Sequence, residues 1–136
     1  MSKNKYIDVY STIYNIDIVV ANKYVTAKDL SELYVYSDGV EIKDDDFNGN
    51  IACTMHCTNK ETGKYCMLVK YVNDSNIKTV DKKIDFLKTI VHEALHVVYG
   101  IYNGIGEKVY PENSNEATAY FFEYVFDCIY KTWTKK

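Results

Sequence analysis

The chain has 136 residues and a formal net charge of −3, and 47% of its residues are hydrophobic and 26% are charged. This length suits one domain with its own core, the composition is that of a soluble globular protein, and the negative charge argues against a nucleic-acid-binding surface. No stretch reaches the roughly 18 apolar residues of a membrane span, and residues 1–12 contain no apolar signal core, so a cytoplasmic protein without nucleic-acid or membrane partners is expected.

The first part of the chain predicts strands and one short helix. Residues 13–20 are rich in β-branched side chains and predict a strand. Residues 26–34 begin with Thr26, a good N-cap, and predict a short helix. An Asp-Gly pair within 34–43 allows a hairpin. The clearest hairpin covers 50–72, with its turn near 60–63.

Helical periodicity follows in the second part. Apolar residues from about 81 to 99 form one stripe, and Gly100 and Gly104 are predicted to end this helix. A second amphipathic helix is predicted over 113–132. Strands followed by two long helices predict one α+β domain over 1–136, with a small, mostly antiparallel sheet in 1–75 and long helices at 81–100 and 113–132.

Two further patterns resemble metal sites but favour simpler interpretations. In an extended strand, Cys53 and Cys57 face one side and His56 the other, so the three cannot bind one ion together. Without a secretory signal, the four cysteines are expected to be thiols. Residues 44–50 match the opening of a calcium-binding loop, but Met55 stands where the bidentate Glu is needed. A solvated acidic turn is the favoured interpretation.

The strongest motif is the pentad His92-Glu93-Ala-Leu-His96. On an α-helix, residues four apart lie on one face, so both imidazoles can reach a single ion. Glu93 then lies beside the metal, where it can take a proton from metal-bound water. The simpler alternative is a solvent-exposed helix that happens to carry two histidines.

A catalytic zinc site usually has three protein ligands and one open position for water. The metzincin solution, a histidine six residues after the second one, is excluded because Tyr102 stands there. Nineteen residues separate His96 from Glu116, which lies in the run Asn-Glu-Ala. These features resemble the HExxH and downstream Glu of thermolysin-like gluzincins over about residues 85–127. A short chain with such a core is also similar to small zincin-like proteins encoded by phages and mobile elements.

The resemblance implies a zinc metallopeptidase, a hydrolase in which His92, His96 and Glu116 bind Zn²⁺ and Glu93 is the general base. Each predicted helix carries a polar stripe opposite its apolar face, and we expect the two polar stripes to face each other. The alternative ligands are Glu112 and Glu123. Glu116 could also serve in a capping box with Asn113 at the start of its helix.

The chain departs from the thermolysin-like pattern at Tyr120, where that family has an Asp that orients the first histidine. Asp85 or Glu123 could take over this role. A donor to the transition-state oxyanion is also needed. Its candidates are Tyr110, Tyr102 and His56.

The expected function is zinc-dependent hydrolysis of a peptide or protein substrate, held along an edge strand at 65–71. The alternative is a non-catalytic zinc-binding structural or interaction protein of phage origin, found in the host cytoplasm or the virion. The intact Glu93 favours the enzyme, because a purely structural site needs no base. Tyr120 and the lack of a second domain favour the alternative.

Overall fold

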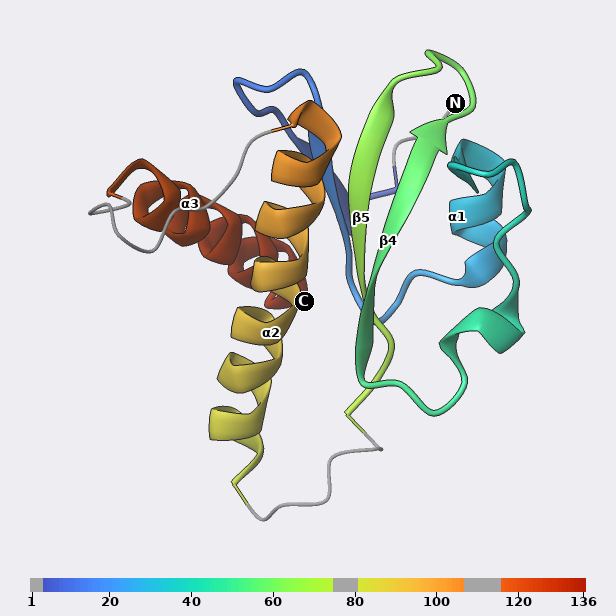
Figure 1. The fold of residues 1–136 in the computed structure, drawn as a ribbon. Helices are drawn as coiled ribbons and strands as arrows, with labels where there is room; N and C mark the ends of the chain where they lie inside the picture. Colours follow the sequence, from blue (N-terminus) through green and yellow to red (C-terminus); the bar gives the residue numbers. More distant parts are fainter. Residues whose placement is uncertain (1–3, 75–80, 107–115) are drawn as a thin grey trace.

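The computed structural model describes residues 4–74, 81–106 and 116–136, and these form a five-stranded sheet with helices on both faces (Figure 1). The strand order is β1-β2-β5-β4-β3, and all neighbours are antiparallel except β2 and β5. The strands are β1 (Ile7–Tyr10), β2 (Asp17–Ala21), β3 (Tyr34–Tyr36), β4 (Ala52–Asn59) and β5 (Tyr65–Tyr71).

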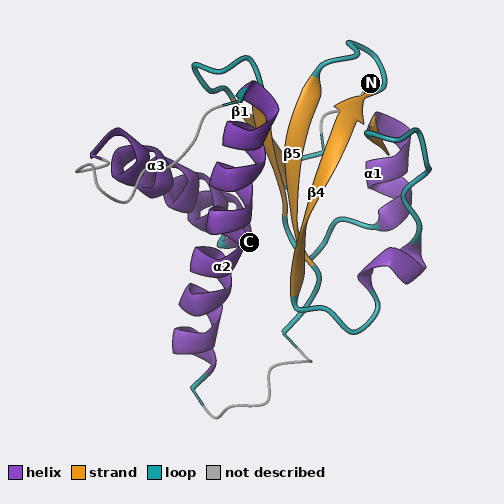
Figure 2. Cartoon of the chain, viewed as in Figure 1, coloured by secondary structure: helices purple, strands orange, loops and turns teal. Residues whose placement is uncertain are grey.

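The helices divide between the two faces of the sheet. Figure 2 shows α1 (Ala27–Leu33) and the 3-10 turn η1 (Asp44–Phe47) on one side. The long helices α2 (Lys82–Ile105) and α3 (Glu116–Trp133) lie on the other side. The predicted α+β class, with a mostly antiparallel sheet followed by two long C-terminal helices, is confirmed. No helix in the described ranges is long and apolar enough to cross a membrane.

Local sequence signals account for several element boundaries. The Thr26 hydroxyl accepts from the Asp29 N–H at 3.1 Å, and the Asp29 carboxylate accepts from the Thr26 N–H at 3.0 Å. This capping box fixes the start of α1 where the sequence predicts it. The predicted hairpin over 50–72 is confirmed as β4 and β5. The strand predicted at 13–20 is β2, which begins at Asp17.

The predicted hairpin over 34–43 is wrong, because only Tyr34–Tyr36 is a strand and it pairs with β4. Pairing with β4 keeps Tyr34 buried in the core beneath α1. The chain turns directly after Tyr36, whose carbonyl accepts from the Gly39 N–H at 2.8 Å. Gly39 adopts φ +90°, a conformation that favours glycine. β1 is a further strand, which the sequence reasoning missed.

α2 also continues past Gly100 and Gly104, where its end is predicted. It reaches Ile105, and Gly106 forms a left-handed cap at φ +75°. A glycine inside a helix costs about 1 kcal/mol relative to alanine. Burial outweighs this cost, because the residues around Gly100 pack into the core: Val97, Val98, Ile101 and Tyr102.

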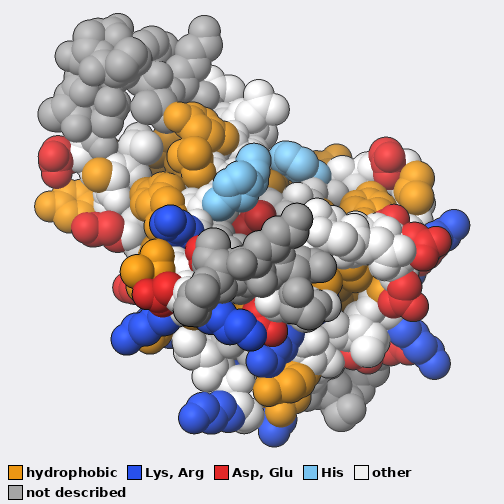
Figure 3. Space-filling view, turned by 90° about the horizontal axis from the view of Figure 1, so that it is seen from below, with side chains coloured by type: hydrophobic (Ala, Val, Ile, Leu, Met, Phe, Trp, Pro, Cys, Tyr) orange, Lys and Arg blue, Asp and Glu red, His pale blue; other side chains and the backbone are white. Residues whose placement is uncertain are grey.

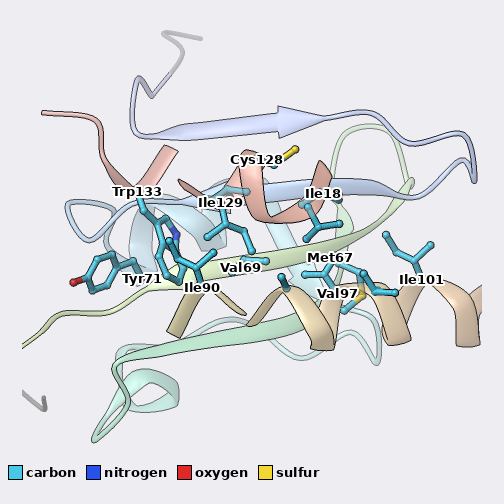
Figure 4. Close-up of a cluster of buried hydrophobic side chains, with 14 of the residues drawn as sticks. Ile18, Met67, Val69, Tyr71, Ile90, Val97, Ile101, Cys128, Ile129 and Trp133 are labelled. Carbon is cyan, nitrogen blue, oxygen red and sulfur yellow. The ribbon is translucent and has the colours of Figure 1, made fainter. Parts of the chain in front are cut away.

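The main core lies between the sheet and the two long helices. Figure 4 shows how strand side chains meet those of α2 and α3 there, among them Ile18, Met67, Val69, Ile90, Val97, Ile129 and Trp133. A second core lies between the sheet and α1. Because side chains alternate along a strand, β4 directs Cys53 and Cys57 toward the second core and Thr54 and His56 toward α2.

Lys70 is an unusual member of the α1 side of the sheet, since it is only 3% exposed. Its ammonium donates to the carbonyls of Asn22, at 3.0 Å, and Tyr71. The ammonium also lies 5.9 Å from the ring centroid of Phe47. Burial lowers the pKa of Lys70 from its ordinary value of 10.5 to about 8.

We expect Lys70 to make stability depend on alkaline pH. Between pH 8 and 10.5 the native amine is neutral while the unfolded chain is still protonated, so the free energy of unfolding rises with pH through this window. Over that range, the free energy of unfolding of the wild type should rise by roughly 2 kcal/mol more than that of Lys70→Met. Urea denaturation of both proteins at several pH values measures the difference. A difference that does not change with pH would contradict this prediction.

Candidate metal centre

His92 and His96 lie on the exposed stripe of α2 that faces β4. Their Nε2 atoms are 3.2 Å apart, and their ring centroids are 4.8 Å apart. Two nitrogen ligands of one tetrahedral zinc ion, each at about 2.0–2.1 Å from it, would be separated by about 3.3 Å. The pair therefore already has the spacing of two ligands of a single ion.

Glu93 is turned from the same helix toward the sheet and is only 5% exposed. Its Oε2 accepts a hydrogen bond from the Thr54 hydroxyl of β4. A buried carboxylate needs such a partner, because losing its hydration is costly. The contact holds Glu93 beside the two histidines, where a base acting on a metal-bound water would have to lie.

A pocket of about 510 Å³ surrounds these three side chains between α2 and the sheet. Figure 3 shows histidine side chains lying together on this face of the molecule. The pocket brings two distant parts of the sequence together. Its lining includes Thr54 and His56 from β4, Met67 from β5, and His92, Glu93 and His96 from α2.

The remaining histidine of the chain, His56, borders the same pocket and packs over Gly100, one turn after His96. A Cβ at position 100 would lie 3.3 Å from His56 Cε1 and 2.5 Å from Met67 Cε. The missing side chain therefore leaves room for the imidazole and the thioether. Gly100, placed inside a long helix, is thus part of how the site is built.

Of the three candidate oxyanion donors, His56 is the one that the described structure places in the pocket. Tyr102 is 4% exposed, and its hydroxyl lies 3.1 Å from that of Thr118 in the contact between α2 and α3. Tyr110 lies outside the described residues. The geometry therefore favours His56 for this role.

Glu116, the predicted third ligand, is the first residue of α3 and is exposed. Within 4–74, 81–106 and 116–136, no three His, Cys, Asp or Glu side chains form a group that could hold a metal ion. The described structure thus unites His92, Glu93 and His96 but does not bring Glu116 to them. Glu116 as a ligand stays a prediction. The alternative ligand Glu112, and Asn113 of the alternative capping box, lie outside the described residues.

The polar stripe of α3 does not face that of α2 as expected, because the two helices pack through apolar side chains. The rings of Tyr102 and Phe121, for example, stack with centroids 5.9 Å apart. Tyr120 is 67% exposed and lines an apolar pocket beside residues 11–14. Glu123 is exposed as well. The histidine stripe of α2 faces β4 instead.

Asp85, the third candidate for orienting an imidazole, lies two turns before His92 on α2. Its Oδ2 atom is buried and has no hydrogen-bond partner among the described residues. It does not line the histidine pocket. In the described part of the chain, no candidate for orienting an imidazole therefore lies against the histidines; the candidates are Asp85, Tyr120 and Glu123.

Cys53 borders the histidine pocket but forms no metal-binding group with the histidines in the described part of the chain, and the acidic turn does not line the pocket. All four cysteines are free thiols. Burial raises the pKa of Cys53 and of Cys57 to about 12, which disfavours the thiolate that binds metals. The acidic run forms the exposed turn η1, in which the Asp46 carboxylate accepts from the Lys43 N–H and the Tyr36 hydroxyl.

Thr54 is the site residue that the sequence reasoning missed. A signal for it is present, because Thr54 and His56 are two apart in a predicted strand and must share a face. The sequence does not reveal that this face meets α2. That relation depends on how the sheet and the helix pack.

No protein-family model, curated protein or solved structure matches the chain. The interpretation of the site therefore rests on the geometry of α2 and β4, together with the pentad itself.

Proposed function

We propose that the protein is a zinc-dependent metallopeptidase of the gluzincin type, with its site between α2 and β4. The observation that carries this proposal is a pair of imidazole nitrogens 3.2 Å apart beside a buried carboxylate that a strand hydroxyl holds in place. Imidazole and carboxylate donors suit zinc. When bound there, zinc would supply an activated water and polarise the scissile carbonyl.

The side chains divide the chemistry among them. His92 and His96 would hold the ion from α2, and Glu116, which the described structure does not bring to them, is proposed as the third ligand from its spacing in the sequence. Glu93 takes a proton from the attacking water and passes it to the leaving amine. His56, across the pocket, donates to the developing oxyanion.

We propose that substrate binds along the part of β4 that β3 does not cover, rather than along the predicted 65–71, because β5 lies between β2 and β4. In the described part, β3 covers only the far end of β4, from Cys57 to Asn59. The His56 carbonyl accepts from the Ser37 N–H on that side, so by alternation the backbone groups of Thr54 also point away from β5. An extended peptide can add to this edge directly beside Glu93.

The compartment is part of the same proposal. Four free thiols fit a reducing environment, and we place the protein in the cytoplasm. Its partner there would be a peptide or protein substrate that can present an extended segment.

A mixed peptide library tests the proposal. With zinc supplied, mass spectrometry should detect new termini in a subset of peptides. A chelator should stop the cleavage, and added zinc should restore it. If the protein binds zinc tightly but cleaves no peptide, the chain is instead a non-catalytic zinc-binding protein. Cleavage that continues in excess chelator would contradict the metal-dependent mechanism.

A further inference from the structure

The contact between Thr54 and Glu93 joins the sheet to the metal helix, across 39 positions of sequence. None of the ion pairs formed by the described residues includes Glu93. The Thr54 hydroxyl is therefore the partner that the described structure gives to this buried carboxylate. A glutamate side chain without a partner could turn among several rotamers.

Thr54 is well suited to hold a side chain still. It lies within β4 opposite Val69 of the central strand β5, so the paired strand holds this part of β4 on one side. Threonine is β-branched and has few χ1 rotamers, so the strand fixes the direction of its hydroxyl. A donor on a rigid strand restrains the carboxylate more firmly than a donor on a loop would.

We infer that Thr54 is a positioning residue, which holds Glu93 Oε2 so that the other carboxylate oxygen is free to act as the base. This inference rests on the proposed peptidase function. It adds that the strand to which the substrate is proposed to bind also aligns the base. Substrate binding and base alignment then share one residue, because the backbone of Thr54 faces the free edge while its hydroxyl faces α2.

Thr54→Val removes the hydroxyl and keeps the shape and the β-branching. We expect an unchanged zinc content and a kcat lowered by about 10–100-fold, because the base is misplaced, with KM changed less than twofold. Thr54→Ser keeps the hydroxyl and should restore most of the rate. Thr58→Val is the matched control, because it makes the same change on the same face of β4, farther from Glu93, and should leave the rate unchanged.

A second readout does not depend on activity. In the metal-free protein, Thr54→Val should lower the urea midpoint when Glu93 is present, since a buried carboxylate loses its partner. The same substitution should have little effect in a Glu93→Ala background. Equal shifts in the two backgrounds would show that the contact does not form, and they would overturn the inference.

The outcomes separate this inference from the proposed function. A wild type that binds zinc and cleaves nothing refutes the peptidase and, with it, the positioning role. An active wild type with an equally active Thr54→Val variant refutes only the role of Thr54. The role is also refuted if Thr54→Ser is as slow as Thr54→Val, because the hydroxyl would then not be the group that matters.

Discussion

Glu93→Gln is expected to abolish peptide hydrolysis while the protein keeps its zinc. Glutamine has the same shape as glutamate, so it can fill the same buried space and accept the Thr54 hydrogen bond through its amide oxygen. It cannot take a proton from water. Loss of a general base typically lowers the rate by about 10²–10⁴-fold. The measurement is kcat/KM on a peptide identified from the library, with zinc content determined on the same sample.

Glu61→Gln is a suitable control for this experiment, because Glu61 lies in the exposed turn between β4 and β5 and the charge change is the same. That variant should retain the wild-type rate. If Glu93→Gln remained as active as the wild type, Glu93 would not be the base. If it lost its zinc, the carboxylate would be acting as a ligand, and the division of roles within the pentad would be wrong.

Glu116→Ala is expected to weaken zinc binding by more than about 100-fold. Loss of a residue that only orients a ligand already costs about 10–100-fold in affinity, so loss of a ligand should cost more. Competition with a chromophoric chelator measures the affinity. The protein fold should be unaffected, because Glu116 is exposed at the first turn of α3.

Glu123→Ala is the matched variant, since Glu123 is exposed on the same helix and is an alternative ligand. It should retain the wild-type affinity. Weak binding in Glu123→Ala together with normal binding in Glu116→Ala would transfer the ligand role to Glu123. Normal binding in both variants would show that neither carboxylate completes the site.

The parts of the fold that depend on local sequence could be predicted. Thr26 marks the start of α1 because a capping side chain acts on the next turn. The β4–β5 hairpin could be predicted because its two strands are close in sequence. The histidine pair could be predicted because i, i+4 spacing alone places both rings on one face of a helix.

The parts that depend on distant packing could not be predicted. β3 pairs with β4 instead of forming the expected hairpin, and α2 continues past Gly100. In both cases burial in the core outweighs local turn and helix preferences. The wall of the site opposite the histidines is formed by Thr54 and His56, and only the packing of α2 on the sheet shows this. The same packing turns the polar stripe of α3 away from the histidines.

The central claim is that the histidine pair of α2 is a zinc site, and elemental analysis of untagged protein tests it most directly. The account predicts one tightly held zinc per chain in the wild type and none in His96→Ala, since a ligand 3.2 Å from its partner nitrogen has been removed. A wild type without zinc, or zinc content that is unchanged in His96→Ala, would contradict the account.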